Sequence, residues 1–175
     1  MTDMHEDSQC EVAHGHAPVQ TAARTLVAVF ASPVAEFLLR YAADAGYRPV
    51  LLEPDPVLAA AGSAGVKVVT SYADCAGPDA DVVLTDHHRS ELGPILRDAL
   101  AGESNWIGIM GSPRHEGPHV AALTELGVPA AEIARVHRPI GLNIGSKSPA
   151  EIAIATIAGL IAERNGCPGG FDFLN

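Results

Sequence analysis

Residues 26–53 read LVAVFASPVAEFLLRYAADAGYRPVLLE, a stretch that predicts a strand, a helix and a second strand in succession. The first five residues form a short apolar run bounded by turn residues, which is typical of a buried strand. Ser32 and Pro33 then supply the N-cap and the first residue of a helix, and Gly46 follows the helix as its C-terminal cap. A second apolar run stops at Pro54. Two buried strands joined by a helix predict a parallel pair with a right-handed crossover.

The alternation of apolar runs and helical stripes continues along most of the chain. It predicts a single α/β domain over residues 23–164, with a doubly wound and mostly parallel sheet. The composition, 47% hydrophobic and only 18% charged, suits a sheet that is covered on both faces. Further strands are expected at 66–69, 81–85, 105–110 and 133–136, and further helices at 56–61, at 92–100 and before Gly127.

The two ends of the chain differ from this domain in composition. Residues 1–22 carry four acids and no lysine or arginine, which predicts a flexible acidic leader. Residues 165–175 are rich in glycine and predict a flexible tail. Histidines and a cysteine of the leader could take up a transition metal, but flexible ligands beside acids favour no binding, and we predict no metal site. The leader residues concerned are His5, Cys10, His14 and His16.

Charge and apolar content exclude several classes of protein. The net charge of −10 opposes nonspecific binding to nucleic acid and to anionic membranes, because both are negatively charged. No apolar stretch reaches the roughly 20 residues of a membrane span, and the leader lacks the basic and apolar regions of a signal peptide. Three widely spaced cysteines define no disulfide framework. We therefore expect a cytoplasmic protein that binds neither nucleic acid nor membrane.

A capping box marks the start of the last helix. The Ser148 hydroxyl and the Glu151 carboxylate can each bind the other's backbone N–H, with Pro149 as the first helical residue. The residues that follow, 152–162, carry no charge. A helix that is apolar nearly all round is buried or lies at a subunit interface, so the sequence leaves open a homodimer formed through this helix.

Polar and glycine-containing segments follow several of the predicted strands. In a doubly wound sheet, ligands bind beyond the carboxyl ends of the strands. Residues 30–33, 53–55, 85–88 and 111–114 are therefore expected to meet at one edge, and the loop 139–148 to join them.

The first of these segments lacks the features of a dinucleotide site. A turn that binds a dinucleotide uses Gly-x-Gly-x-x-Gly, whereas residues 30–35 contain no glycine, and Pro33 removes an N–H donor. Glu53 stands about 20 residues further on, where an acid would bind a ribose, although an acid beside Pro54 is also ordinary turn chemistry. We do not expect NAD or NADP to bind in the usual manner.

Residues 85–88, Thr-Asp-His-His, carry the candidates for catalysis. Asp86 and His87 could act as acid and base or as metal ligands. Asp86 could instead simply cap the next turn, and we assign no catalytic residue.

Two further segments are candidates for ligand binding. Backbone N–H groups at residues 111–112, helped by Arg114, could bind a phosphate or another oxyanion. The glycines of loop 139–148 either contact a ligand or let the loop seal the sheet. The predicted cofactor-binding residues are Ser32, Glu53, Thr85, Asp86, His87, Gly111, Ser112, Arg114, Gly141, Asn143 and Gly145.

Two stretches resemble the C-terminal, Rossmann-like domain of the XdhC/CoxI family: WIGIMGS at residues 106–112 and RVHRPIGLNIGSKSPAEIA at residues 135–153. With residues 85–88 in the expected place, the similarity spans about residues 26–162. The resemblance implies a Rossmann-like fold and an accessory role in maturing molybdenum hydroxylases such as xanthine or carbon monoxide dehydrogenase. Such proteins bind the molybdenum cofactor (molybdopterin), protect it during sulfuration and pass it to the apo-enzyme. We expect a non-catalytic, or at most weakly catalytic, factor.

The chain departs from the family pattern at several points. It has Phe30-Ala-Ser-Pro33 in place of a glycine-rich turn, Thr85-Asp-His-His88 in place of Thr-His-Asp-His, and less positive charge around Arg114. The family's separate N-terminal domain has no counterpart in this sequence, which leaves three possibilities: a stand-alone divergent member, a subunit whose partner supplies the rest, or a domain that has lost cofactor binding. The expected partners are an apo molybdenum hydroxylase and either a sulfurtransferase or a protein that supplies the family's N-terminal domain. Two other functions stay open: a small NAD(P)- or flavin-dependent oxidoreductase, and a non-catalytic interaction module that dimerises.

Overall fold

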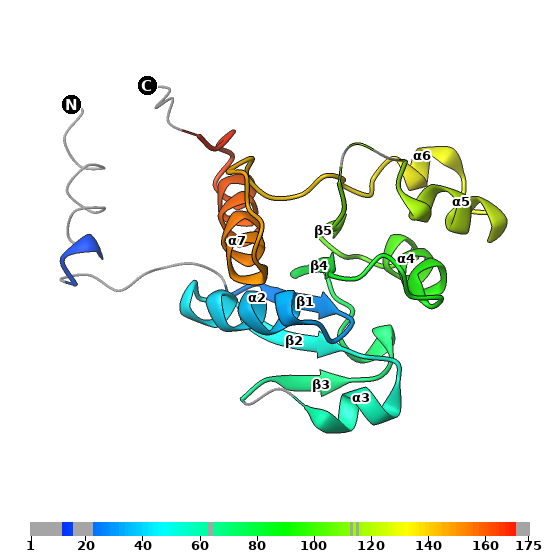
Figure 1. Ribbon diagram of the computed structural model, residues 1–175, viewed down its shortest axis with the longest axis horizontal. Coiled ribbons are helices and arrows are strands. Elements are labelled where there is room, and N and C mark those ends of the chain that lie inside the picture. Colours follow the sequence, from blue (N-terminus) through cyan, green and yellow to red (C-terminus); the bar gives the residue numbers. More distant parts are fainter. Residues whose placement is uncertain (1–11, 16–22, 63–64, 113, 115, 171–175) are drawn as a thin grey trace.

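The computed structural model describes residues 12–15, 23–62, 65–112, 114 and 116–170, and a five-stranded parallel sheet forms its centre (Figure 1). The strands are β1 (Thr25–Val29), β2 (Arg48–Leu52), β3 (Lys67–Val69), β4 (Ala80–Leu84) and β5 (Trp106–Ile109). Their order across the sheet is β3-β2-β1-β4-β5, so the chain builds outward from β1 first in one direction and then in the other. This reversal beside β1 defines a doubly wound sheet and confirms the predicted fold class.

Helices cover both faces of the sheet. Figure 1 shows α2 (Pro33–Asp44) and α7 (Pro149–Arg164) together on one face. The other face carries α4 (Leu92–Ala101), α5 (Pro118–Glu125) and α6 (Ala130–Ile133). A short helix α3 (Pro56–Ala61) precedes β3, and a 3-10 turn η1 (Tyr72–Asp74) follows it.

The core is divided by the sheet because successive residues of a strand point to opposite faces. In β1, Leu26 and Ala28 pack with α2 and α7, whereas Val27 and Val29 pack with α4, α5 and α6. All four are completely buried. This explains why β1 is apolar at every position from Leu26 onward, as a parallel strand covered on both faces requires.

The register brings the carboxyl ends of the central strands to one edge. Val29 is paired with both Leu52 and Leu84, and Leu84 is paired with Ile109. The segments that leave β1, β2, β4 and β5 therefore start side by side, as predicted.

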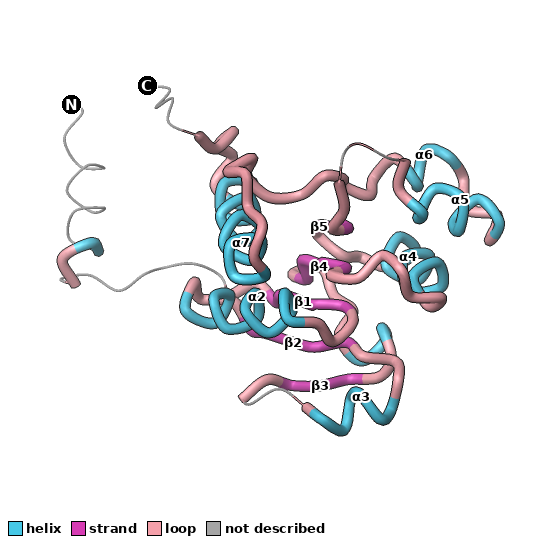
Figure 2. The backbone as a smooth tube through the Cα atoms, in the orientation of Figure 1, coloured by secondary structure: helices cyan, strands magenta, loops and turns pink. Residues whose placement is uncertain are grey.

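The predicted strand at 133–136 is wrong. Ala130–Ile133 forms the short helix α6, which begins after Pro129, and Figure 2 shows the chain from α6 to α7 as loop. Only His137 pairs with the sheet, through an isolated bridge to Gly108 of β5. A proline fixes φ near the helical value and is well tolerated at a helix start. Pro129 therefore favours a helix here, although the apolar residues of 133–136 suggested a strand.

The last helix is buried against its own chain. Ala153, Ile157 and Leu160 of α7 are nearly inaccessible and pack on α2, so α7 needs no second subunit to cover this face. Among its apolar residues Ile154 stands out, with 47% of its surface exposed. The homodimer stays a prediction.

The capping box at the start of α7 is confirmed. Ser148 Oγ accepts a hydrogen bond from Glu151 N at 3.3 Å, and the Glu151 carboxylate accepts one from Ser148 N at 3.0 Å. Replacing Ser148 with alanine should lower the free energy of unfolding by about 1 kcal/mol. Thermal denaturation should then show a melting temperature lower by roughly 2–4 °C. An unchanged melting curve would mean that the cap contributes nothing to stability.

The terminal segments are described only in part. Most of the predicted acidic leader lies outside the described residues, including His5, Cys10 and His16 of the weighed metal ligands. In the predicted tail, Cys167 N donates to Ala162 O at 2.8 Å, and residues 171–175 lie outside the described part. In the described ranges, no helix has the length and apolar character needed to cross a bilayer.

Candidate functional site

A cavity of about 730 Å³ lies beyond the carboxyl ends of β4 and β5, roofed by residues 139–146 of the loop between α6 and α7. This is the place where a doubly wound sheet binds its ligands. The volume falls within the range of small-molecule and cofactor sites, roughly 300–1,000 Å³. Its lining consists of Val34 of α2, Thr85 and His87 after β4, Met110, Gly111, Ser112 and Arg114 after β5, residues 139–146, and Ile152, Ala155 and Thr156 of α7.

Most of the residues predicted from the sequence meet in this cavity. The expectation that segments 85–88 and 111–114 line one cleft is confirmed. Ser32, Glu53 and Asp86 do not line the cavity, and their side chains are engaged elsewhere. The predicted residues that line it are Thr85, His87, Gly111, Ser112, Arg114, Gly141, Asn143 and Gly145.

Ser32 and Thr85 tie the turn after β1 to the end of β4. The Ser32 hydroxyl accepts from Ala35 N at 3.1 Å as the N-cap of α2 and lies 2.9 Å from Thr85 Oγ1. Thr85 Oγ1 in turn donates to the carbonyl oxygens of Val29 and Phe30. Both interactions of the Ser32 hydroxyl are therefore made within the protein. Ser32 contributes to the cavity only through its contact with Thr85, which lines the wall.

The two candidates for proton transfer have different surroundings. Asp86 Oδ1 accepts a hydrogen bond from His88 N at 2.9 Å, which is the turn-capping role weighed from the sequence. His87 lines the cavity, and partial burial lowers its pKa from the ordinary value of 6.5, helped by the neighbouring His88 and by Arg138 and opposed by Asp86. A lowered pKa leaves the His87 imidazole neutral near pH 7, where it can accept or donate one hydrogen bond within the cavity.

Arg138 positions the segment after β5 and was not predicted as a site residue. Its guanidinium donates to Ser112 O at 2.7 Å, and a Cβ built on Gly111 would lie 2.8 Å from Arg138 Nε. A side chain at position 111 would therefore require the Arg138 guanidinium to move. The only signal in the sequence was the place of Arg138 in the long stretch 135–153 that resembles the XdhC/CoxI family.

The roof of the cavity packs directly on α7. Gly141 has a φ of 82°, and a Cβ there would lie 2.9 Å from the backbone of Ala155. Leu142 N donates to Ala155 O at 3.0 Å. Gly145 also has a positive φ, 69°, but its Cβ would meet nothing within 4 Å. Gly141 is therefore a packing residue, and Gly145 a turn residue.

The turn after β1 is filled from within the protein. Phe30 adopts a φ of 73°, the left-handed region that usually requires glycine, and its side chain is completely buried. The Glu53 carboxylate, also completely buried, accepts from Ala31 N at 2.7 Å and from Asp55 N at 3.0 Å. Arg89 donates to both oxygens of this carboxylate and lies 4.7 Å from the centre of the Phe30 ring.

The charge of Arg89 is shared between two carboxylates. Arg89 also donates to Glu91 Oε1 at 3.0 Å, and this bond is the main cause that lowers the pKa of Glu91 to about 2. The same bonds raise the pKa of Arg89 above its already high value. Arg89 was not predicted from the sequence, because nothing in its local pattern indicates a contact with Glu53, which lies 36 residues earlier.

His119 lies buried beside the segment after β5, and burial lowers its pKa from 6.5, with a further contribution from Arg138 and opposition from Glu116. Its ring would lie 2.3 Å from a Cβ on Gly117. In the unfolded chain His119 binds a proton near pH 6.5, whereas in the folded protein it binds that proton only at a lower pH.

Stability should consequently fall as the pH drops below about 6.5, and replacing His119 with glutamine should make this fall shallower. Urea denaturation of both proteins at about pH 7.5 and pH 5.5 measures the difference. The sign follows from a depressed folded pKa, which makes stability rise with pH. Equal slopes for the two proteins would contradict the assignment to His119.

Metal binding receives no support in the described ranges, where no three residues among histidine, cysteine, aspartate and glutamate are grouped as ligands. The rings of His87 and His88 lie with their centres 4.1 Å apart and their planes tilted by 41°, but these adjacent residues form a pair only. The prediction of no metal site remains a prediction.

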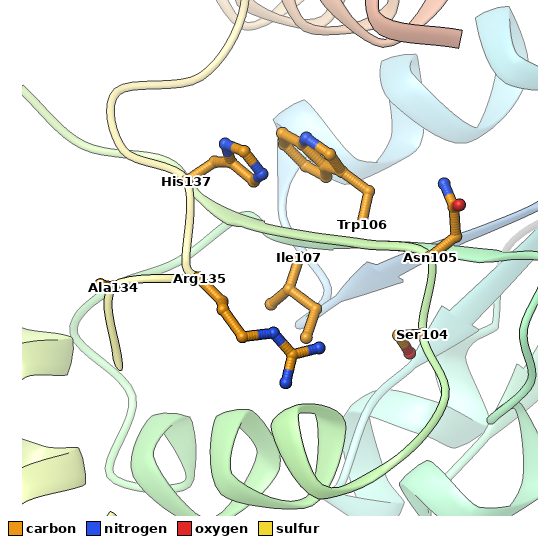
Figure 3. Close-up of a pocket in the computed structure, with 7 residues that line it drawn as sticks. All are labelled: Ser104, Asn105, Trp106, Ile107, Ala134, Arg135 and His137. Atoms are coloured by element: carbon orange, nitrogen blue, oxygen red, sulfur yellow. The ribbon is translucent and has the colours of Figure 1, made fainter. Parts of the chain in front are cut away.

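A smaller hollow of about 210 Å³ lies at the outer edge of β5 (Figure 3). Figure 3 shows the rings of Trp106 and His137 on one side of the strand. The two rings stack, with their centres 4.9 Å apart and their planes at an angle of 8°. A Cβ on Gly108 would lie 2.2 Å from the indole of Trp106, so glycine allows the ring to lie flat over the strand. The stack covers the single bridge between Gly108 and His137, and we regard this hollow as part of that packing.

Comparison with known proteins places the chain in a family. The family model described as the XdhC Rossmann domain matches residues 26–160. The uncharacterized protein YqeB of Escherichia coli K12 is 34% identical over 124 residues, which cover 70% of this chain and 22% of YqeB. A crystal structure described as a xanthine dehydrogenase from Bacillus halodurans superposes with a TM-score of 0.68 at 25% identity. That match covers 83% of this chain and 46% of the other, so the chain spans less than half the length of either protein.

Proposed function

The chain belongs to the XdhC family through its Rossmann domain, and from this we propose that it binds the molybdenum cofactor in the cavity at the ends of β4 and β5 and delivers it to a molybdenum hydroxylase. The observation that carries the proposal is the cavity itself, which gathers eight of the eleven predicted cofactor-binding residues. The similarity to the structure described as a xanthine dehydrogenase supports the proposed link to a molybdenum hydroxylase.

The walls of the cavity fit a flat heterocycle. Val34, Met110, Ile140 and Ile152 supply apolar surface from four different segments. Ligand pockets typically combine such surface with a few polar groups that fix orientation. His87 and Asn143 supply polar atoms suited to the ring nitrogens and oxygens of a pterin.

The segment after β5 fits a phosphate. Ser112 and Arg114 line the cavity. The Arg138 guanidinium holds this segment in place by donating a hydrogen bond to Ser112 O. An arginine binds a phosphate through charge-assisted hydrogen bonds that are about twice as strong as neutral ones. We assign Arg114 to the phosphate of the cofactor, with Ser112 as a second donor.

The proposed role is to hold and shield the cofactor. The bound cofactor supplies the oxygen-transfer chemistry of the hydroxylase, and the residues of this chain position it and keep water from one face. Asp86 is committed to its turn, which leaves His87 as the titratable group in the cavity from segment 85–88. We propose no catalytic residue.

The partners follow from the same proposal. We propose that other proteins supply further parts of the delivery system. These are the apo-hydroxylase that receives the cofactor, a sulfurtransferase and a protein carrying the remaining family domain.

Binding of purified molybdopterin to the full chain, measured anaerobically by calorimetry, tests the proposal. Arg114→Gln should weaken binding by roughly tenfold or more, because a hydrogen bond to a charged group contributes about 1.5–3 kcal/mol. Arg97→Gln is the matched control, since Arg97 is exposed on α4 and pairs with Asp98. A wild-type chain that does not bind molybdopterin would overturn the proposed function.

A further inference from the structure

The ligand-binding edge of the sheet has one half over β1 and β2 and another over β4 and β5, and the described cavity lies over β4 and β5. A Rossmann dinucleotide lies across both halves, with its pyrophosphate at the turn after the first strand and a ribose at the acid that ends the second strand. Here the cavity lies over β4 and β5, and Val34 is its contact with α2. The half over β1 and β2 is occupied by Phe30, Glu53 and Arg89.

Glu53 stands where the pyrophosphate of a dinucleotide would accept hydrogen bonds. In the dinucleotide mode, backbone N–H groups of the first turn point at the phosphates. In this protein the N–H of Ala31 in that turn donates to Glu53 Oε2 at 2.7 Å, and Asp55 N donates to Oε1 at 3.0 Å. The protein thus provides its own anion for these donors.

Arg89 and Phe30 hold this anion in place. Arg89 donates to Oε2 at 3.3 Å and to Oε1 at 2.9 Å, which makes a two-point contact with the carboxylate. The guanidinium also covers the Phe30 ring, which fills the space that a glycine would leave. A second phosphate arriving at Ala31 would have to displace a carboxylate held by four hydrogen bonds, or lie beside a like charge.

We propose that Glu53 is an internal anion that occupies the phosphate position of the first turn, so that the cavity accepts a heterocycle carrying one phosphate and rejects a ligand extended by a second nucleotide. The inference rests on the proposed function for the identity of the heterocycle. It assigns Glu53 and Arg89 as specificity-determining residues, in place of the ribose-binding role that was one of the two alternatives for Glu53 in the sequence.

The test compares two probes on the full chain: molybdopterin, and molybdopterin joined through its phosphate to cytidine monophosphate. The wild type should bind molybdopterin at least about tenfold more tightly than the dinucleotide form. Glu53→Gln removes the charge and keeps the size, and it should reduce this preference to about threefold or less while the affinity for molybdopterin changes little. Glu91→Gln is the control, because it removes the charge of the other carboxylate on Arg89 without touching the turn, and it should retain the full preference.

A second measurement protects the test if Glu53→Gln does not fold. In amide NMR spectra of the wild type, saturating molybdopterin should shift the signals of Gly111 and Gly141 and leave that of Ala31 unchanged. Equal affinity of the wild type for both probes, an unchanged preference in folded Glu53→Gln, or a shift of the Ala31 signal would overturn the inference and leave the proposed function standing. Failure of the wild type to bind molybdopterin at all would overturn both.

Discussion

Replacing Gly141 with alanine should lower the free energy of unfolding by about 3 kcal/mol, whereas the same replacement at Gly145 should lower it by about 1 kcal/mol. Both glycines have a positive φ, 82° and 69°, so each alanine bears the strain of the left-handed region. At Gly141 the new Cβ would also lie 2.9 Å from the carbonyl carbon and oxygen of Ala155, in the middle of α7. A helix backbone cannot move aside as a flexible side chain can.

Urea denaturation of the two variants and the wild type measures this difference in the free energy of unfolding, and thermal denaturation measures the melting temperatures. With melting shifts of roughly 2–4 °C per kcal/mol for a chain of this length, Gly141→Ala should melt about 6–12 °C below the wild type. Gly141→Ala should also weaken molybdopterin binding, because the roof of the cavity separates from α7. Losses of equal size at both positions would contradict the packing of the roof on this helix.

The elements of the sheet could be predicted because their signals are local. Strand β1 is an uninterrupted apolar run, and helix α2 begins at a Ser-Pro pair and ends before Gly46, whose φ is 82°. The capping box of α7 was equally local, spanning residues 148–151. The one strand predicted wrongly, at 133–136, is a short segment interrupted by Arg135, and the proline at position 129 precedes a helix instead.

The location of the site at one edge of the sheet could be predicted, because the carboxyl ends of parallel strands meet there. The residues that hold the edge together were not predictable, since their contacts join distant segments. Arg138 reaches Ser112 across 26 positions, and Arg89 reaches Glu53 across 36. Periodicity and short motifs carry no information about such pairs.

The assignment of Glu53 shows the same limit. Its spacing from the first turn suggested a ribose ligand, and its place at the end of β2 is as expected. What spacing could not show is that the carboxylate turns back onto Ala31 N and is completely buried there. The Phe30 ring is also completely buried, with the Arg89 guanidinium 4.7 Å from its centre.

Removing the guanidinium of Arg89 with Arg89→Met should lower the free energy of unfolding by about 3 kcal/mol, the lower end of the range for breaking a buried ion pair. The lower end applies because the Arg89 side chain is 20% exposed, whereas that of Glu53 is inaccessible. The loss arises because the Glu53 carboxylate remains buried with two backbone donors and no countercharge. Thermal denaturation should show a melting temperature lower by roughly 6–12 °C.

The double variant Arg89→Met with Glu53→Gln should recover a large part of the stability lost in Arg89→Met, because a neutral amide tolerates burial without a cation. Glu91→Gln is the control: Glu91 is half-exposed, so losing its bond to Arg89 should lower the free energy of unfolding by no more than about 1 kcal/mol. The three variants and the wild type form a comparison that separates the charge of Glu53 from the packing of Arg89 on Phe30. If the double variant were no more stable than Arg89→Met, the packing of Arg89 on the ring, 4.7 Å away, would be its main contribution, and the charge balance at Glu53 would not be.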